Sequence, residues 1–272
     1  VRFGALDLVR GDWRRYTNTL EPNDTNPEDD NTELDVTAVN IQENNERCPV
    51  NYITPPGVQR EQLYNNNTLI NQNEQSLSLR IAGDGLEPLD TRAVFKNISV
   101  DMRQFKKLKM FLHAESLPGE IPAEDDEMVG FIRFGNDFTQ NFYQIEIPLK
   151  VTKTTSGNCS YTPDEVWPQA NEIDLALSLL TSLKIEARSI DPTTLPLDGI
   201  YYKNEDELDG GLANKINKLR LGIKGNPNFG MVRTLMVGIK SAATHKDVKG
   251  EVWFNELRLA EMDNKGGMAA IL

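Results

Sequence analysis

The chain has 272 residues, with 41 acidic against 29 basic side chains and a formal net charge of −12 at pH 7. This balance argues against nucleic acid as a partner, because proteins that bind phosphates carry a basic surface. No apolar run approaches the roughly 18 residues of a membrane helix. The sequence starts at Val1 without a leader pattern, so we expect a piece of a longer protein.

The first part of the chain is polar. Residues 1–20 predict a first strand around Trp13, and residues 21–31, "EPNDTNPEDDN", are too polar to bury much apolar surface. A strand is expected at residues 34–41, followed by a second polar loop. We therefore interpret residues 21–76 as an Asn-rich insertion with long surface loops, which are more often functional than accidental.

Beyond residue 76 the apolar side chains recur at every second position. Such alternation is typical of strands with one buried face. The turns between these segments are rich in Gly, Asn and Asp, which suits antiparallel hairpins. The clearest sets are Leu77, Leu79 and Ile81; Leu108, Met110 and Leu112; Tyr143, Ile145 and Ile147; Leu219, Leu221 and Ile223; and Leu235, Val237 and Ile239.

One segment departs from this pattern. In residues 172–188, Ile173, Leu177, Leu180 and Leu183 fall on one stripe of a helix, so we predict a helix there. The beginning of the segment also alternates, which leaves a strand open as the alternative.

A strand is predicted near the C-terminal end, in "GEVWFNELRLAEMDNKGGMAA" at residues 250–270. Strict alternation places Trp253 and Leu257 on one face and Val252 and Phe254 on the other. We expect the Trp253 face to meet an opposite sheet. The predicted helix, or a neighbouring domain, would then cover Val252 and Phe254, which makes these two residues candidates for an interface.

These elements predict a mainly β chain. We expect a single antiparallel β-sandwich over residues 1–272, of the jelly-roll, galactose-binding-like kind, with one helical insertion and long polar loops. Alternation alone would also fit an outer-membrane barrel. Low aromatic content, long loops on both sides and the helix at 172–188 favour the sandwich.

Cys48 and Cys159 are a candidate disulfide, and two separate buried thiols are the alternative. Neither cysteine lies at zinc-ligand spacing from His113 or His245, so we predict no metal there. "NEDELDGG" resembles a calcium loop, but Leu208 stands where an oxygen ligand is needed. No cofactor is predicted.

Catalytic motifs are missing from the sequence. There is no nucleophile elbow, and His113 reads as a surface or lightly packed residue on the polar side of a strand. With 41 acidic residues a glycosidase pair is conceivable, but no spacing selects one. We therefore predict a protein that is not an enzyme.

Three aromatic residues in loop-like context are candidates for stacking on sugar rings: Trp167, Tyr201 and Tyr202. The alternative is that they anchor loops onto the sandwich. An exposed loop aromatic on a β-sandwich is what a carbohydrate-binding module would present.

Four strings together resemble the SprA (Sov) family: "ALDLVRGDWRRY", "DTRAVFKNISVDMRQFKKLKMFLHAE", "DEVWPQANEID" and "VWFNELRLAEMDNKGGMAA". The resemblance touches nearly the whole chain and is weakest in residues 21–76. Members are giant outer-membrane proteins of Bacteroidota associated with gliding motility and type IX protein secretion. The family has no catalytic residues to transfer.

The resemblance implies a non-enzymatic structural and interaction domain of a translocon, facing the cell exterior, with the periplasm as the alternative. Its partners would be the remainder of its own barrel protein and other translocon or secreted proteins. A carbohydrate-binding module of a cell-surface protein is the second hypothesis, and a glycosidase is the third.

Overall fold

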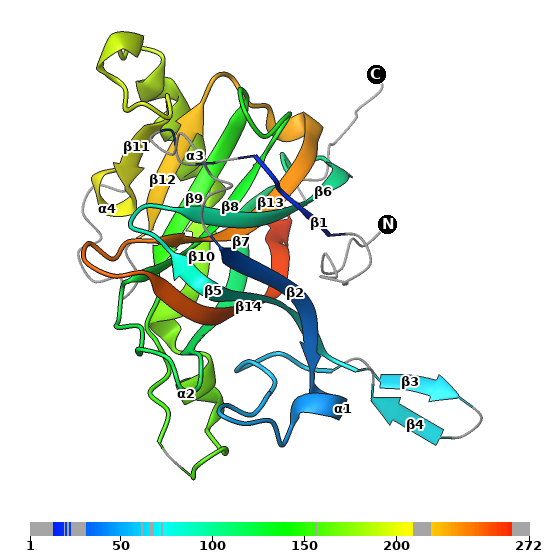
Figure 1. Ribbon diagram of the computed structural model, residues 1–272. Coiled ribbons are helices and arrows are strands. Elements are labelled where there is room, and N and C mark those ends of the chain that lie inside the picture. The colour runs from blue at the N-terminus through cyan, green and yellow to red at the C-terminus, as the bar shows by residue number, and fades with distance from the viewer. Residues whose placement is uncertain are drawn as a thin grey trace, which may run out of the picture.

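The computed structural model (Figure 1) describes residues 13–18, 20, 22, 31–60, 62–65, 68–71, 73–155, 157–208 and 219–262. These residues form two antiparallel sheets that pack face to face, which confirms the predicted β-sandwich. No helix in the described ranges is both long and apolar enough to cross a membrane.

Among the described residues, the larger sheet has seven strands. Their order is β1 (Arg14–Arg15), β6 (Thr91–Val100), β13 (Val232–Ser241), β8 (Met128–Gly135), β9 (Phe142–Pro148), β12 (Arg220–Lys224) and β11 (Tyr201–Asn204). The smaller sheet, counted over the same residues, has five strands in the order β10 (Glu172–Ala176), β7 (Phe105–Ser116), β14 (Val248–Met262), β5 (Gln75–Leu86) and β2 (Thr32–Asn40).

The main core lies between the two sheets. The long strands contribute alternate residues to it, as the alternation predicted; Leu79, Leu112 and Phe254 come from the smaller sheet, and Ile132 and Val237 from the larger one.

The sheets approach each other closely at Gly130. A Cβ on Gly130 of β8 would lie 2.6 Å from Leu112 Cδ2 of β7, a distance that real Cβ atoms do not adopt.

β14 is the central strand of the smaller sheet, and both of its faces are buried. The predicted assignment of these faces is wrong. Val252 and Phe254 point into the main core, and Trp253 points to the other side of the sheet. A β-bulge interrupts the pairing between Asn255 and Arg258, and the extra residue turns Leu257 to the Val252 face.

The predicted helix at residues 172–188 is half right. Residues Glu172–Ala176 form β10, which pairs with β7, and the helix α3 covers Leu177–Ala187. Leu177, Leu180 and Leu183 are buried in the main core. Because α3 contacts both β7 and β12, it closes one end of the space between the sheets.

The smaller sheet also carries a layer on its outer face, which we call the outer layer and define as residues 41–60 and 150–168. It contains α1 (Ile41–Asn44) and α2 (Pro163–Val166). It packs around a second apolar cluster of Val39, Val50, Tyr52, Phe111, Tyr161, Val166, Trp167 and Trp253. In Figure 1 both helices lie at the lower end of the molecule.

The described parts of the region predicted as an Asn-rich insertion, residues 21–76, contain regular secondary structure. It includes β2, α1 and a hairpin of β3 (Gln62–Asn65) and β4 (Thr68–Asn71) that projects from the body (Figure 1). Residues 23–30, residues 1–12 of the predicted first strand, and residues 263–272 lie outside the described residues. The remaining short helices are η2 (Gln169–Asn171), η3 (Pro192–Thr194), α4 (Glu205–Leu208) and η4 (Phe229–Met231).

Candidate functional site

The three candidate sugar-stacking aromatics are not brought together. Trp167 is only 3% exposed, and its Nε1 donates to Ile53 O at 2.7 Å, so its ring belongs to the interior of the outer layer. The prediction that Trp167 is an exposed ring is wrong. The alternative, that it anchors a loop onto the sheet, describes the observed contact.

Tyr201 and Tyr202 point to opposite faces of β11. Tyr201 packs against the main core. The Tyr202 ring lies 3.7 Å from the Arg220 guanidinium carbon, and its hydroxyl donates to Asp198 Oδ2 at 3.2 Å. Burial raises the pKa of Tyr202, so its phenol stays protonated. Tyr201 is half-buried against the core, and the face of the Tyr202 ring is covered by Arg220.

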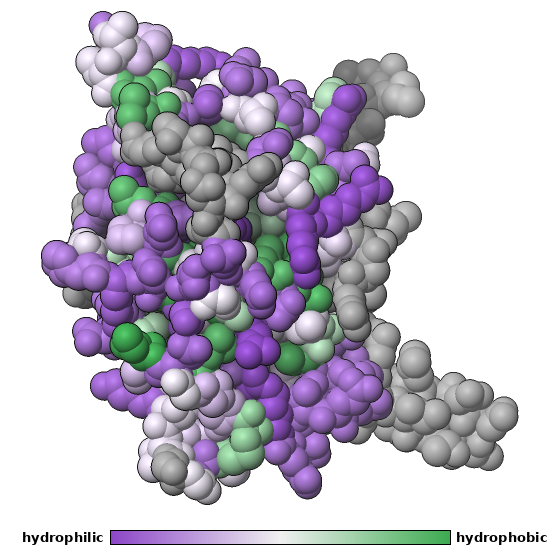
Figure 2. Space-filling view, viewed as in Figure 1, coloured by the Kyte–Doolittle hydropathy of each residue, from purple (hydrophilic) through white to green (hydrophobic). Residues whose placement is uncertain are grey.

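The predicted interface residues have no exposed surface. Val252 and Phe254 are fully buried between the sheets, so they make no apolar patch. Within the described ranges, the large hydrophobic residues that are exposed sit on separate segments: Leu89, Ile121, Ile185, Leu197, Met231 and Met262. The face shown in Figure 2 is mostly hydrophilic, with hydrophobic areas that are small and separated.

A disulfide between Cys48 and Cys159 joins the two segments of the outer layer. One segment precedes β5 and the other follows β9, and 111 positions separate the two cysteines in sequence. The disulfide thus holds the 41–60 segment and the 150–168 segment together over the Trp253 face of the sheet.

A charged cluster is buried beneath the outer layer. Arg47 Nη2 lies 2.6 Å from Glu115 Oε1 on β7 and 2.7 Å from Glu251 Oε2 on β14. The Arg47 guanidinium also lies over the Trp253 ring, 5.2 Å from its centroid. Trp253 Nε1 and Ser78 Oγ each donate to Glu251 Oε1 at 2.7 Å. Two carboxylates in a largely dry site are thereby matched with donors from three segments.

His113 belongs to the same cluster, and the prediction of a surface residue is wrong because it is fully buried. Its Nδ1 lies 2.8 Å from Val166 O, which can only accept, so Nδ1 carries the proton. Its Nε2 lies 3.3 Å from Glu115 Oε2. The imidazole therefore links β7 to the outer layer at α2.

The pKa of Glu115 lies below its ordinary value. Burial by itself would raise this pKa, but the hydrogen bonds and charges of His113 and Arg47 outweigh it. Glu115 is therefore a carboxylate at neutral pH and its oxygens already accept from partners. A general acid needs a raised pKa and access to a substrate, and Glu115 has neither.

One signal in the sequence pointed to this cluster and was missed. The face of β7 with Phe111, His113 and Glu115, like the face of β14 with Glu251 and Trp253, mixes aromatic and ionisable residues. A face open to water would rarely carry Trp and Phe, so the mixture indicates a covered polar network.

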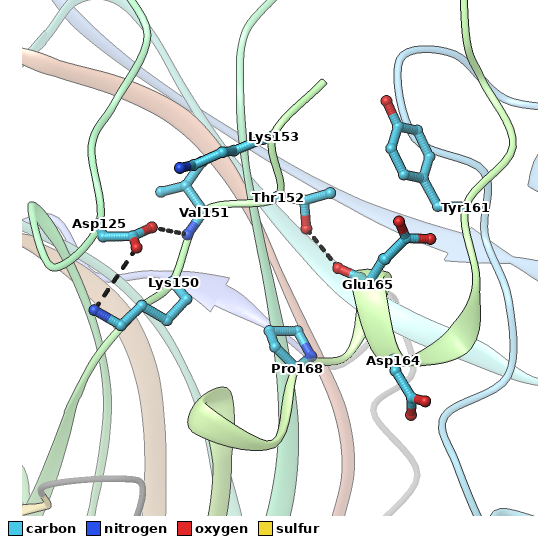
Figure 3. Close-up of a pocket in the computed structure, with 9 residues that line it drawn as sticks. All are labelled: Asp125, Lys150, Val151, Thr152, Lys153, Tyr161, Asp164, Glu165 and Pro168. Carbon is cyan, nitrogen blue, oxygen red and sulfur yellow. Dashed lines mark hydrogen bonds and ion pairs between the residues drawn. The ribbon is translucent and has the colours of Figure 1, made fainter. Parts of the chain in front are cut away.

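A pocket opens beside this cluster (Figure 3). We call it the Thr152 pocket; its volume is about 260 Å³. It is lined by Asp125, Lys150, Val151, Thr152, Lys153, Tyr161, Asp164, Glu165 and Pro168. In Figure 3 the extended segment with Val151, Thr152 and Lys153 runs along one side, and the segment with Tyr161, Asp164 and Glu165 lies on the other.

Hydrogen bonds fix the walls of the Thr152 pocket. Thr152 Oγ1 donates to Glu165 O at 3.0 Å and lies 3.3 Å from His113 Nδ1, which ties the pocket to the buried cluster. Val151 N donates to Asp125 Oδ1 at 3.0 Å, and Lys150 Nζ lies 2.8 Å from Asp126 Oδ2. The lining of the pocket therefore includes charged residues of both signs, and hydrogen bonds hold its walls.

A comparison with known families assigns the chain. The family described as SprA_N, motility related/secretion protein, matches residues 1–272. The chain belongs to the SprA_N family. A search of curated proteins finds no match. The resemblance inferred from four strings of residues is thus confirmed over the length of the chain, and the protein is related to motility and secretion.

In the described part of the SprA_N chain, no group of three or more His, Cys, Asp and Glu residues is placed to hold a metal ion. The acidic string that resembles a calcium loop begins with β11 and α4, where Glu207 Oε2 accepts from Asn204 N at 2.7 Å. Residues 209–211 of that string lie outside the described residues.

Proposed function

We propose that this SprA_N chain is a non-enzymatic structural and interaction domain of a giant outer-membrane protein that type IX protein secretion and gliding motility require. The observation that carries the proposal is the family match over residues 1–272. The domain is a single sandwich within the larger protein. Its partners are the barrel portion of that protein and other translocon or secreted proteins.

The chemistry of the outer layer supports a role without catalysis. The buried carboxylates Glu115 and Glu251 are hydrogen-bonded to Arg47, His113, Ser78 and Trp253. They are therefore engaged by protein groups and not turned toward a substrate. Such a cluster fixes the position of loops on a sheet. Loops held on a rigid scaffold are typical binding surfaces.

The disulfide supports a location outside the cytoplasm, since disulfides persist in oxidising compartments. We place the domain at the outer membrane on the extracellular side, with the periplasmic side as the alternative. The acidic surface keeps such a domain soluble beside the membrane.

The test is a deletion within the parent gene of a gliding member of the Bacteroidota. Residues 31–262 are removed in frame, and immunoblots of outer-membrane fractions check that the parent protein is still made. We expect the amount of type IX cargo in the culture medium and the spreading of colonies to fall strongly. Normal secretion and spreading with the deleted protein in the membrane would refute the proposal.

A second experiment separates this role from the carbohydrate-binding alternative. The purified chain and its Tyr202→Ala variant are compared on a glycan array and in affinity gels. We expect no sugar-dependent retention for either protein. Retention that is lost in Tyr202→Ala would favour the carbohydrate-binding module instead.

A further inference from the structure

The strand β2 lies at one edge of the smaller sheet, and among the described residues its only partner strand is β5. It has nine residues, whereas the other edge strands of the two packed sheets, β1, β10 and β11, have two, five and four. Proteins commonly protect a sheet edge with Pro, Lys, a bulge or a very short strand. β2 contains no Pro or Lys, and its register with β5 runs without a shift, so it has none of these protections.

The hydrogen bonds at the two ends of β2 show which of its backbone groups face outward. Ile41 N donates to Glu74 O at 3.1 Å. At the other end, Asp84 N donates to Asn31 O at 3.3 Å. Residues 31 and 41 therefore both bond toward β5, and in an antiparallel pair this role falls on every second residue. Positions 33, 35, 37 and 39 face β5, whereas positions 34, 36 and 38 turn their N–H and C=O groups away from it.

The outward backbone groups of Leu34, Val36 and Ala38 make no hydrogen bond with any described residue. At the next outward position, Asn40 N donates to Asn44 Oδ1 at 2.9 Å, so α1 closes the edge there. We call residues 34–38 the open edge. A row of unpaired N–H and C=O groups is a template for pairing with another extended chain.

The side chains of β2 select what such a chain carries on its two faces. Leu34 and Val36 are half-buried and pack against the rim of the main core, so apolar side chains beside them would complete their burial. Glu33 and Asp35 are exposed on the opposite face of the strand. A residue directly across from each acid is therefore best a Lys or Arg.

The charges already near these two acids leave room for such partners. Glu33 makes no ion pair with any described residue. Asp35 lies 3.9 Å from Arg15 in a pair that is exposed on both sides, which contributes little. Arg80 is opposite Asp35 on β5, away from the open edge, and the two form no ion pair. An added strand would approach both acids from the unpaired side.

A second copy of the chain is a poor occupant of the open edge. Antiparallel self-pairing centred on Leu34 or on Asp35 places acidic side chains of the two copies opposite each other. Each chain also has a net charge of −12, which repels a second copy and attracts a cationic segment.

We propose that the open edge of β2 binds an extended segment of a partner protein, which adds one antiparallel strand to the smaller sheet. The segment alternates apolar side chains, which contact Leu34 and Val36, with basic side chains, which lie opposite Glu33 and Asp35. Antiparallel pairing follows the rest of the sheet and is slightly more stable per residue than parallel pairing.

This inference rests on the proposed function in one respect, because it names the kind of partner that the interaction domain takes. The two fail separately. The binding test uses the purified 272-residue chain and synthetic peptides, whereas the secretion test removes residues 31–262 in the cell.

Hydrogen exchange followed by NMR tests the open edge in the chain alone. The amides at positions 34, 36 and 38 should exchange at least about tenfold faster than those at 33, 35 and 37, because only the second set bonds to β5. Equal protection of both sets in the chain alone would overturn the proposal, since the edge would then already be covered.

Titration with blocked peptides tests the partner. Acetyl-KVKVKVK-amide should bind with a Kd on the order of 1 mM and protect the amides at positions 34, 36 and 38. Acetyl-EVEVEVE-amide should bind at least about tenfold more weakly. N-methylation of the three valines removes the N–H groups that face β2 and should also weaken binding at least about tenfold. N-methylation of the second and third lysines, whose N–H groups face away, is the matched control and should leave the Kd unchanged.

Two variants of the chain test the same contact. Ala38→Pro removes an outward N–H and leaves the bonds to β5, so it should weaken KVKVKVK binding about tenfold, whereas Ala38→Ser keeps the N–H and should bind normally. Glu33→Gln should weaken binding about threefold. Its control is Glu124→Gln, because Glu124 is exposed and lies outside β2.

Three binding results would overturn the proposal. One is equal affinity for the lysine and glutamate peptides, which would remove the basic partner. Another is equal affinity for the two N-methylated peptides, which would show that the peptide adds no strand. The third is a dimer of the chain in sedimentation that Ala38→Pro dissociates, which would make a second copy the occupant.

Discussion

At the scale of single residues, the positions of most interest are those with an unusual backbone conformation or a shifted pKa. Leu89, Asp126, Glu256 and Glu261 adopt positive φ, the left-handed region that favours glycine. Glu256 does so inside the bulge of β14, where the extra residue reverses the faces of the strand. At a position outside the bulge, the free-energy cost of a positive φ can be measured by substitution with glycine.

Leu89 offers the simplest test. It has φ of 70° and its side chain is half exposed, so Leu89→Gly relieves left-handed strain and loses little buried surface. We expect the variant to be stabilised by about 0.5–1 kcal/mol in urea unfolding. Leu197→Gly is the control, because Leu197 is 79% exposed without positive φ and should be destabilised by about 0.5 kcal/mol. Equal effects of the two substitutions would contradict the strain at Leu89.

Glu115 makes the stability depend on pH. Its folded pKa is depressed, so its contribution is present above the unfolded value of 4.5 and is lost as the pH falls through the folded pKa. Glu115→Gln should therefore cost about 2 kcal/mol at pH near 6. This difference from the original chain should shrink steadily below pH 4.5.

The measurement is guanidinium unfolding of both proteins across this pH range. Glu87→Gln is the matched control, since Glu87 is exposed, and its difference from the original chain should stay near zero. A difference for Glu115→Gln that grows as the pH falls would show that the carboxylate is not stabilised by His113 and Arg47.

At the scale of elements, alternation in the sequence located the strands well. Leu77 to Ile81 and Leu108 to Leu112 lie where one-sided burial requires them, because side-chain direction follows directly from the period of a strand. A bulge adds one residue and has no composition of its own, so the faces of β14 could not be read from strict alternation.

The change from strand to helix at residue 177 was only partly visible, because alternation at the start of the segment left a strand open but did not mark its end. Glu172–Ala176 and Leu177–Ala187 both carry apolar residues that satisfy either period over a few positions. Tertiary contacts decide between strand and helix. Residues Glu172–Ala176 pair with β7, and Leu177–Ala187 cover the open end of the core. The family strings anticipated the family, but no local pattern anticipated the Thr152 pocket, because its walls come from separate loops.

The outer layer should depend on its disulfide. Cys48→Ser/Cys159→Ser removes a cross-link over 111 positions, which is expected to lower the free energy of unfolding by about 4 kcal/mol in the chain-entropy model. Trp167 lies in the interior of the layer and Trp253 beneath it, so their fluorescence should report the change. The original chain with a mild reductant serves as a second arm and should match the double variant. An unfolding midpoint that both treatments leave unchanged would contradict the clamp.

At the scale of the whole molecule, the two sheets form one core, and the close approach of Gly130 to Leu112 is a test of that packing. Gly130→Ala forces a Cβ against Leu112 of the facing sheet and should cost about 2 kcal/mol. In a Leu112→Ala background the added methyl has room, so the same change should cost at least about 1 kcal/mol less. Urea unfolding of the four proteins gives this coupling, and additive costs would mean that the sheets do not meet there.

The central claim is that this chain covers both faces of its own smaller sheet, with the main core on one side and the disulfide-clamped outer layer on the other. Hydrogen exchange followed by mass spectrometry tests it most directly, with and without reduction of Cys48–Cys159. We predict strong protection of Val248–Met262 in the oxidised chain, and faster exchange in residues 41–60 and 150–168 after reduction, while Val232–Ser241 of the larger sheet keeps its rate. Exchange of residues 41–60 and 150–168 at the rate of unstructured chain in the oxidised protein would contradict the claim.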